Sequence, residues 1–301
     1  MAHGSIRNEE AEELRMQRPL SPPIDRTYRQ PKLQLPPGAC DTHFHFIGPQ
    51  KLFPLKPNHV FSHLEFEDTT IDDWLRMQDA LGLSRGLHVQ SMMYENNYQL
   101  AVHAQCRLPD RLRAVVIPWP GVTDKELEIL TACGVVGYRV TYRLEKEIDL
   151  RMVARVHEHG WGIHYLVKAD DEWRKRILAS PGRFVIEHMG GIDPSEGLES
   201  ASFKFLQQCL DTGRCWVKLS PRPSKQETFP FDDMLPFVRR LVDRFPNRLL
   251  WGSDWPHPQY FRPMPNEVDL LDQMLDWVPS ETIRSMIFVH NPTECLGFPP
   301  P

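Results

Sequence analysis

Residues 112–169 read LRAVVIPWPGVTDKELEILTACGVVGYRVTYRLEKEIDLRMVARVHEHGWGIHYLVKA, and this stretch decides the fold. Short apolar runs alternate in it with longer stretches whose apolar residues recur every three or four positions, which is the period of an α-helix. The short runs are 112–119, 135–142 and 161–169, and the longer stretches are 123–133 and 149–159. Strand–helix repeats of this kind favour right-handed crossover units and a parallel sheet.

The same alternation extends over most of the chain. Further strand-like runs lie at 39–46, 84–91, 183–190, 215–221 and 248–255, and a further helical pattern lies at 233–244. Eight strands in this order fit closure into a (β/α)8 TIM-like barrel, so we predict a single barrel domain over residues 39–301. An open doubly wound sheet is the alternative, although the sequence lacks the glycine-rich phosphate-binding motifs of its nucleotide-binding forms.

Residues 1–38 are polar and proline-rich, and we predict an extended N-terminal arm there. The whole chain has 41% hydrophobic residues and a net charge of −5, an ordinary composition for a globular protein. This charge gives no basic surface for nucleic acid. No apolar run approaches the ~20 residues that cross a membrane. Scattered cysteines and the lack of a signal-peptide pattern predict a cytoplasmic protein with reduced thiols, and a homo-oligomer stays open.

Polar side chains end three of the predicted strands. His43 and His45 close the first run two positions apart, so both imidazoles project from one face of the strand. His188 ends the sixth run before two glycines, and Asp254 ends the eighth run between two tryptophans. Because barrel enzymes carry their functional groups where the strands end, we expect these four side chains to form one active site. Apolar neighbours can raise the pKa of Asp254 towards that of a useful base.

Each of these residues also has a purely structural interpretation. The histidines can be packed at the end of a barrel without any chemistry, and Asp254 can cap a helix or turn, since Pro256 follows it closely.

Three motifs, taken in this order, resemble the amidohydrolase superfamily. They are Cys40-Asp41-Thr42-His43-Phe44-His45, Glu187-His188-Met189-Gly190 and Trp251-Gly252-Ser253-Asp254-Trp255-Pro256-His257-Pro258. Together with Val289-His290-Asn291-Pro292-Thr293 near the C-terminus, they resemble more narrowly the lactonase branch of that superfamily, over about residues 36–298. The resemblance implies a (β/α)8 barrel and a hydrolase that opens a small anionic lactone, as in the breakdown of aromatic compounds.

The resemblance also implies roles for individual residues. Asp254 takes a proton from the attacking water, and His43, His45 and His188 hold the carbonyl oxygen as it becomes negative. Arg139 matches an arginine that binds a substrate carboxylate, a task that suits a forked guanidinium, although a salt bridge is its structural alternative. The other candidates for substrate binding are Arg143, Tyr165, Arg222, Tyr94 and His257.

The chain departs from the pyrone dicarboxylate lactonases at several pocket positions. Gly191 stands where they have an arginine, and Leu166 aligns with a tyrosine. After the second strand, Met92, Met93 and Tyr94 replace small or polar residues. Fewer cationic groups and more apolar surface predict the same chemistry on a different substrate.

A zinc site is the alternative to metal-free chemistry. His43, His45, His188 and Asp254 form a donor set for one Zn²⁺. In the branch that the chain resembles, the pyrone lactonases work without a metal and the sulfomuconolactone hydrolases use zinc. The seventh run carries no additional histidine, and Lys168 is a candidate for a lysine that bridges two metals. We therefore predict that no cofactor is required.

Two other functions remain open. A zinc-dependent decarboxylase of the same superfamily needs a tightly bound metal and a proton-shuttling histidine, for which His164 and His257 are the candidates. A non-catalytic barrel that binds a small molecule or a partner protein is favoured if His43, His188 and Asp254 do not converge on one cavity.

Overall fold

The computed structural model describes residues 19–167, 170–258 and 263–301, and its strands form one eight-stranded parallel sheet in sequence order. The strands are β1 Cys40–Phe44, β2 Arg85–Val89, β3 Leu112–Val116, β4 Val135–Thr141, β5 Gly162–Leu166, β6 Phe184–Ile186, β7 Cys215–Leu219 and β8 Leu249–Trp251. Each of the eight predicted runs contains one of these strands, and each strand pairs in parallel with the next.

Hydrogen bonds bring the two edges of the sheet together. The Thr42 hydroxyl in β1 donates to the Trp251 carbonyl at the end of β8, at 2.8 Å. Beyond the strand ends, the backbone N–H of Asp254 donates to the carbonyl of His43 at 2.8 Å. These bonds join β1 to β8, so the predicted (β/α)8 barrel is confirmed and the open doubly wound sheet is wrong.

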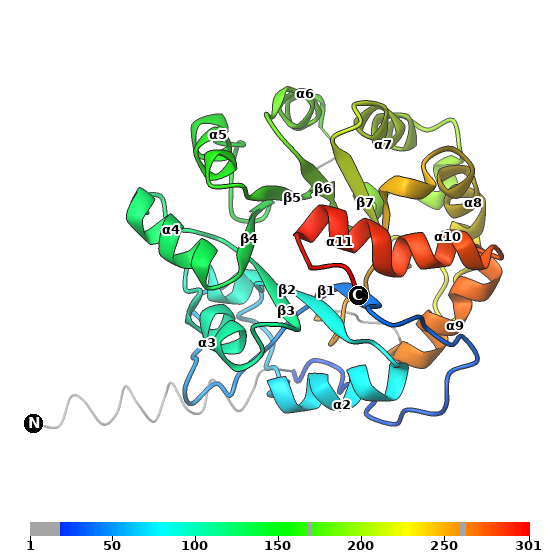
Figure 1. Cartoon of the computed structure of the whole chain (residues 1–301), viewed down its shortest axis with the longest axis horizontal. Helices are drawn as coiled ribbons and strands as arrows, with labels where there is room; N and C mark the ends of the chain where they lie inside the picture. Colours follow the sequence, from blue (N-terminus) through cyan, green and yellow to red (C-terminus); the bar gives the residue numbers. More distant parts are fainter. Residues whose placement is uncertain (1–18, 168–169, 259–262) are drawn as a thin grey trace, which may run out of the picture.

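Helices surround the barrel (Figure 1). They are α2 Ile71–Leu81, α3 Gln99–Arg107, α4 Asp124–Ala132, α5 Leu150–Glu158, α6 Asp171–Ala179, α7 Ala201–Asp211, α8 Leu235–Arg244, α9 Glu267–Trp277, α10 Glu281–Ser285 and α11 Asn291–Leu296. The three predicted helical stretches contain α4, α5 and α8. Local capping explains where two of them begin: Thr123 and Glu126 form a capping box at α4, and Asp149 accepts from the first turn of α5.

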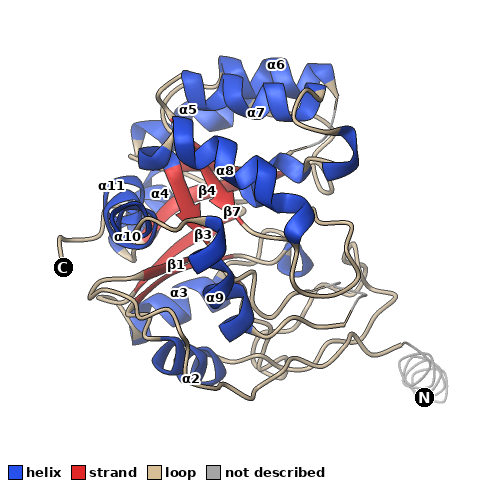
Figure 2. Ribbon diagram, turned by 90° about the vertical axis from the view of Figure 1, so that its right-hand side faces the viewer, coloured by secondary structure: helices blue, strands red, loops and turns tan. Residues whose placement is uncertain are grey.

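Around the strands, the hydrophobic core has an outer and an inner part because successive side chains of a strand point to opposite faces. On β3, Ala114 and Val116 belong to the large cluster beneath the helices, whereas Val115 belongs to a smaller inner cluster. Other members of the inner cluster are Leu87, Val185, Trp216, Leu250, Cys295, Leu296 and Phe298. The last three come from α11 and the residues after it, so the C-terminal segment plugs one end of the barrel (Figure 2). The Phe298 ring lies 5.3 Å from the Arg85 guanidinium at the start of β2, so the plugged end is the amino-terminal one.

Residues 19–38 of the predicted arm pack against the barrel. The Asp272 carboxylate of α9 accepts hydrogen bonds from the backbone N–H groups of Lys32 and Leu33 and from the Arg29 guanidinium, at 2.7–3.0 Å. The side chains of Ile24 and Leu33 are buried. The first 18 residues of the predicted arm lie outside the described residues.

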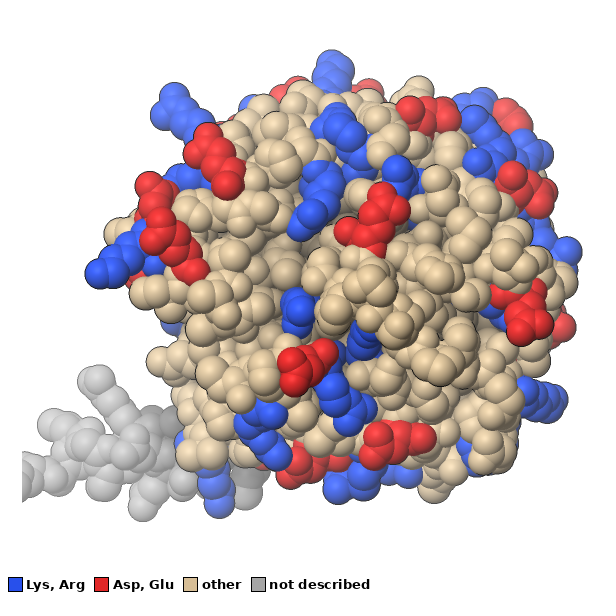
Figure 3. All heavy atoms as spheres, in the orientation of Figure 1, with Lys and Arg blue, Asp and Glu red and all other residues tan. Residues whose placement is uncertain are grey.

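The molecular surface carries charges of both signs, which are interspersed over the face shown in Figure 3. Among the described residues, no helix has both the length and the apolar character needed to cross a membrane.

Candidate active site

β1 and the residue that follows it supply two histidines to the open end of the barrel. His43 and His45 are both buried, and their Nε2 atoms lie 3.3 Å apart. Asp41, two positions before His43 on the same face, holds this region in place. One oxygen of its carboxylate accepts from the backbone N–H groups of His43 and Ser253 at 3.0 Å, and the other accepts from the Ser253 hydroxyl at 2.6 Å.

The segment after β8 brings Asp254 against β1. Gly252 allows the close approach, because a Cβ atom added there would lie 2.6 Å from the Cβ of His43. Asp254 itself has φ 63°, in the left-handed region that non-glycine residues rarely adopt. Strained backbone of this kind persists where the surrounding contacts determine it, and here it directs the carboxylate into the barrel mouth.

A left-handed turn after β6 places His188. His188 and Met189 have φ values of 49° and 50°, and the two glycines that follow continue the turn. The turn ends the strand and directs the His188 imidazole across the barrel, with its Nδ1 2.9 Å from the Ser220 hydroxyl.

The four residues predicted from the sequence converge on one carboxylate oxygen. Asp254 Oδ1 lies 3.6 Å from His43 Nε2, 3.5 Å from His45 Nε2 and 3.8 Å from His188 Nε2. This oxygen is buried, and within the described part of the chain it accepts no hydrogen bond. A non-catalytic barrel was favoured only if His43, His188 and Asp254 did not converge, and the structure brings them together. A buried carboxylate oxygen without a donor marks a place for a water molecule or a cation.

Burial and charge fix the ionisation of these groups. Burial acts to raise the pKa of Asp254, but the nearby Arg222 guanidinium and the histidines lower it well below its ordinary value. Burial lowers the pKa of His45 and that of His43, and it lowers the pKa of His188 to about 4. At neutral pH the site therefore contains an ionised Asp254 beside neutral imidazoles. The low pKa corrects the expectation that an apolar setting raises it, because Arg222 and the histidines together outweigh the effect of burial.

Three buried charged residues, Arg139, Glu187 and Lys218, lie beneath the histidines, and only Arg139 was among the predicted site residues. Arg139 forms an ion pair with Glu187, with Arg139 Nη2 2.9 Å from Glu187 Oε2, and donates to the Gln90 carbonyl at 2.9 Å. Lys218 Nζ lies 3.1 Å from His43 Nδ1, and burial lowers the pKa of Lys218 to about 8. A lysine in the middle of the otherwise apolar β7 was the sequence signal that could have identified this group, because lysine is almost never fully buried without a partner.

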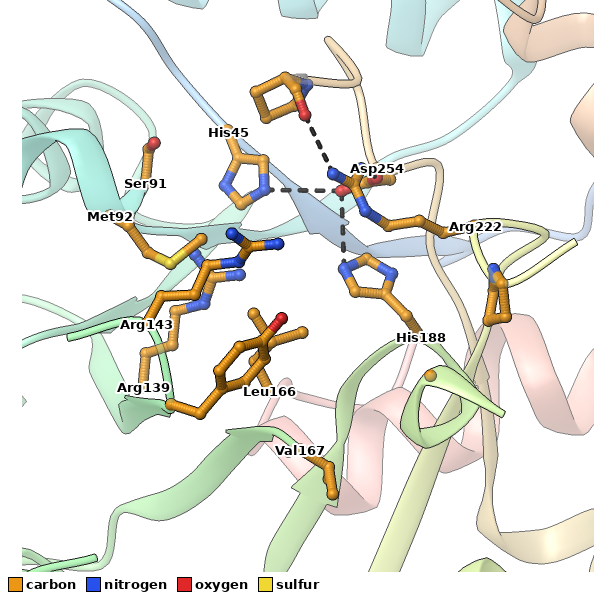
Figure 4. Close-up of a pocket in the computed structure, with 14 residues that line it drawn as sticks. His45, Ser91, Met92, Arg139, Arg143, Leu166, Val167, His188, Arg222 and Asp254 are labelled. Carbon is orange, nitrogen blue, oxygen red and sulfur yellow. Dashed lines mark hydrogen bonds and ion pairs between the residues drawn. The ribbon is translucent and has the colours of Figure 1, made fainter. Parts of the chain in front are cut away.

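A pocket of about 390 Å³ opens above these residues (Figure 4). Its lining consists of His45, Ser91, Met92, Arg139, Tyr142, Arg143, Leu166, Val167, His188, Gly191, Arg222, Pro223, Asp254 and Pro258. Its volume suits a small molecule. His45, His188 and Asp254 line it directly, whereas His43 lies beneath them and is fully buried.

The three arginines of the pocket have different partners. The Arg139 guanidinium is engaged by Glu187 and Gln90, as described above. Arg222 is paired with Asp254 Oδ2 and donates to the Pro258 carbonyl at 3.0 Å. Arg143 is exposed, its guanidinium lies 5.3 Å from the centre of the Tyr142 ring, and it forms no ion pair within the described part of the chain. Arg143 and Arg222 reach into the pocket from opposite sides (Figure 4).

The other predicted substrate-binding residues lie elsewhere. The Tyr94 hydroxyl accepts from the Gly48 N–H at 2.8 Å, and the Tyr165 hydroxyl is 2.6 Å from the Ser180 hydroxyl, both away from the pocket lining. His257 Nε2 lies 3.0 Å from Glu267, next to a small cavity behind Asp254. Lys168, the candidate for bridging two metals, lies outside the described residues.

Among the described residues, two groups of side chains have the spacing of metal ligands. They are His43, His45 and Asp254, and His43, Glu187 and His188. In the first group, the donor atoms are 3.3–3.6 Å apart. A tetrahedral Zn²⁺ with bonds of 2.0–2.1 Å has ligand atoms roughly 3.3–3.4 Å apart, so this group fits a single zinc ion.

Comparison with known proteins places the chain in a family. Residues 40–298 match the family model described as amidohydrolase. The chain is 31% identical to 4-sulfomuconolactone hydrolase of Hydrogenophaga intermedia over 275 residues, which cover 87% of this chain and 90% of that protein. It is 28% identical to 2-pyrone-4,6-dicarboxylate hydrolase of Comamonas testosteroni, over 87% of this chain and 91% of that protein.

A solved structure supports the fold. The structure is that of a probable 2-pyrone-4,6-dicarboxylic acid hydrolase from Acinetobacter baumannii with citric acid bound, which has 23% sequence identity to this chain. The TM-score is 0.75, and the match covers 87% of this chain and all of the other. These matches confirm the resemblance inferred from the three motifs, and the chain belongs to the amidohydrolase family.

Proposed function

We propose that the protein hydrolyses a small anionic lactone, with Asp254 as the general base. The observation that carries this proposal is the buried Oδ1 atom of Asp254, which accepts no hydrogen bond from the described residues. Asp254 lines a pocket into which arginines reach from two sides (Figure 4). The identity of 31% to a sulfomuconolactone hydrolase supports the substrate class. A lactone from the breakdown of aromatic compounds or sugar acids fits this pocket in size and charge.

Asp254 Oδ1 accepts a hydrogen bond from the attacking water and takes its proton as the water oxygen bonds to the lactone carbonyl carbon. The bond between that carbon and the ring oxygen then breaks, and the proton passes to the leaving oxygen. His188, on the pocket side of the carboxylate, donates through Nε2 to the carbonyl oxygen as it becomes negative. His43 lies too deep to touch the substrate, so this proposal gives it an orienting role in place of the carbonyl contact expected from the sequence.

The anionic part of the substrate binds the arginines at the rim. Arg143 forms no ion pair with the described residues, so it can bind a substrate carboxylate without breaking one. Arg139 and Arg222 would each have to leave an ion pair. A second contact to Arg222 draws that guanidinium from Asp254. Because Arg222 is the strongest of the charges that lower the pKa of Asp254, its movement makes Asp254 a better base when the substrate is bound.

Replacement of Arg143 should weaken substrate binding more than it slows chemistry. Hydrogen bonds to charged groups contribute about 1.5–3 kcal/mol, so we expect Arg143→Met to raise KM for an anionic lactone about 10- to 100-fold with kcat nearly unchanged. Steady-state kinetics check this. Arg107→Met, which removes an exposed arginine paired with Asp72 on α2, is the matched control and should leave both constants unchanged. An unchanged KM in Arg143→Met would remove Arg143 from the carboxylate site.

The pH dependence of kcat/KM should show no loss of activity from the protonation of a histidine near pH 6.5. Since burial lowers the pKa of His188 to about 4 and the pKa of Asp254 lies below its ordinary value, both keep their charge states as the pH falls from 7 to 5. We expect kcat/KM to stay level over that range and to decline only below about pH 4–5, measured with a lactone whose carboxylate stays ionised. Half-maximal activity near pH 6.5, the value of an ordinary histidine, would contradict the neutral imidazoles of this site.

A zinc ion fits the group of His43, His45 and Asp254, and Asp254 Oδ1 has no other partner within the described chain. Bound there, it would polarise the lactone carbonyl as a Lewis acid. The proposed reaction uses Asp254 and His188 without it. Metal analysis of protein purified without chelator, with activity measured before and after dialysis against a chelator, tests this. Activity that survives the loss of metal supports the metal-free reaction, and activity that returns only with zinc overturns it.

The substrate class is tested with a panel of lactones that includes muconolactones and aldaric lactones, with ring opening followed by proton release. We expect turnover of lactones that carry a carboxylate and little turnover of their methyl esters. The zinc-dependent decarboxylase is the competing outcome, and release of carbon dioxide would identify it. Its proposed proton shuttles, His164 and His257, are not among the residues that line the pocket.

A further inference from the structure

The strongest unexplained feature of the molecule is the lysine beneath the histidines. Lys218 has no exposed surface, although a buried ammonium group is costly without partners. Its Nζ atom lies 3.1 Å from His43 Nδ1. The mechanism proposed above does not use this group, which contacts neither the pocket nor the attacking water.

The chemistry of donors and acceptors fixes the direction of a series of hydrogen bonds that begins at Lys218. An ammonium group can only donate, so His43 Nδ1 must accept, and a neutral His43 then carries its hydrogen on Nε2. At the other end, His45 Nδ1 lies 2.6 Å from the Val89 carbonyl, which can only accept, so His45 carries its hydrogen on Nδ1. His45 Nε2 therefore presents a lone pair to the Nε2–H of His43 at 3.3 Å.

The two ends of this series agree with each other. Hydrogen bonds run from Lys218 to His43, from His43 to His45 and from His45 to Val89, and at each of these three contacts a donor meets an acceptor. These hydrogen bonds leave Asp254 Oδ1 without a donor. That oxygen is the atom to which we assign the attacking water.

Glu187 offers His43 the opposite arrangement. Its Oε1 atom is buried, accepts no hydrogen bond within the described chain and lies 3.8 Å from His43 Nδ1. If His43 donated through Nδ1 to this carboxylate, its Nε2 lone pair would face those of His45 and Asp254. A carboxylate behind a histidine is the usual orientation of a metal-ligating imidazole. Lys218 and Glu187 thus compete for one nitrogen, and the contact at 3.1 Å belongs to Lys218.

We propose that Lys218 is a positioning residue that holds His43 as a hydrogen-bond donor and so keeps it from acting as a metal ligand. The role of the centre in hydrolysis rests on the proposed function, but the state of His43 does not. Removal of the lysine releases Nδ1 to Glu187 and turns the centre into a better cation site.

The experiment compares wild type with Lys218→Met, a change that removes the donor and keeps an unbranched side chain. Histidine labelled with ¹⁵N reports which ring nitrogen of His43 carries hydrogen, with His43→Asn used to assign the signal. Zinc affinity is measured in parallel by competition with a chelator. Lys204→Met, which removes a surface lysine, is the matched control.

We expect hydrogen on His43 Nε2 in the metal-free wild type and on Nδ1 in Lys218→Met. Zinc should bind Lys218→Met about tenfold or more tightly, since changes behind a ligating histidine alter metal affinity 10- to 100-fold. In a His43→Asn background the same lysine change should alter zinc affinity less than about twofold, because the effect passes through His43.

Hydrogen on His43 Nδ1 in the wild type, or an unchanged zinc affinity in Lys218→Met, would overturn the proposal. If Lys218→Met fails to fold, the wild-type spectrum still decides the state of His43. None of these measurements uses a lactone. The role of Lys218 can therefore be supported in a protein that opens no lactone, and it can be overturned in a protein that is a lactonase.

Discussion

Asp254→Asn is expected to lose about 100- to 10,000-fold in kcat/KM for an anionic lactone, the range that general-base catalysis contributes. Asparagine has nearly the same shape as aspartate, but its amide cannot take a proton from water. The variant should unfold cooperatively and still bind the ring-opened product, because Arg143 and the rest of the pocket lining are unchanged.

The matched control for this change is Asp272→Asn. Asp272 is also a buried carboxylate in an ion pair, but it lies on α9, where it holds the N-terminal segment through Arg29. We expect its kcat/KM to stay within about twofold of wild type, since isolated changes remote from the site act independently. If Asp254→Asn retained wild-type activity, Asp254 would not be the base.

Among the substitutions predicted here, Arg139→Met is expected to lower the free energy of unfolding the most. It leaves the Glu187 carboxylate, which has no exposed surface, without the cation that lies 2.9 Å away. Removing one partner of a buried ion pair costs about 3–5 kcal/mol in the free energy of unfolding, and we expect a loss in this range from urea unfolding at pH 7. The pKa of Glu187, held at about 2 largely by Arg139, should rise in the variant.

The sign of the pH effect follows from that pKa. When folding lowers the pKa of a carboxyl group, the group stabilises the folded protein at any pH above the pKa that it has in the unfolded chain. For Glu187 this contribution disappears as the pH falls towards 2. Arg139→Met should therefore lose part of the acid dependence of unfolding.

Adding Glu187→Gln to this variant should recover stability, because the uncompensated charge is gone. Arg107→Met should change stability by about 0–1 kcal/mol, as expected for an exposed pair. Equal losses in Arg139→Met and Arg107→Met would mean that the buried pair adds little.

Much of the fold was predictable because it depends on patterns that repeat. Strand-like runs and helical periods alternate along the chain, and all eight predicted runs contain a strand. The convergence of His43, His45, His188 and Asp254 was predictable for a related reason. Parallel strands in a barrel end at the same rim, so polar residues at several strand ends must meet there.

The partners of these residues could not be predicted in the same way. Whether Arg139 faces a substrate or the Glu187 carboxylate depends on where the end of β6 lies relative to β4, which hydrophobic periodicity does not encode. The pKa of Asp254 is lowered by Arg222, a residue from the loop after β7, and by His188 and His45, none of which is its neighbour in the sequence. Tyr94 and Tyr165 were candidates from the resemblance to the lactonase branch, but each hydroxyl meets a neighbour outside the pocket lining.

The most direct test of the central claim is the fate of solvent oxygen during turnover. A muconolactone that the enzyme consumes is incubated in H₂¹⁸O, and the product is analysed by mass spectrometry. If Asp254 directs a water to the carbonyl carbon, each turnover places one solvent oxygen in the newly formed carboxylate and none in the new hydroxyl or enol. A product without solvent oxygen, as from isomerisation of the lactone, or with the label on the alcohol carbon would contradict the account.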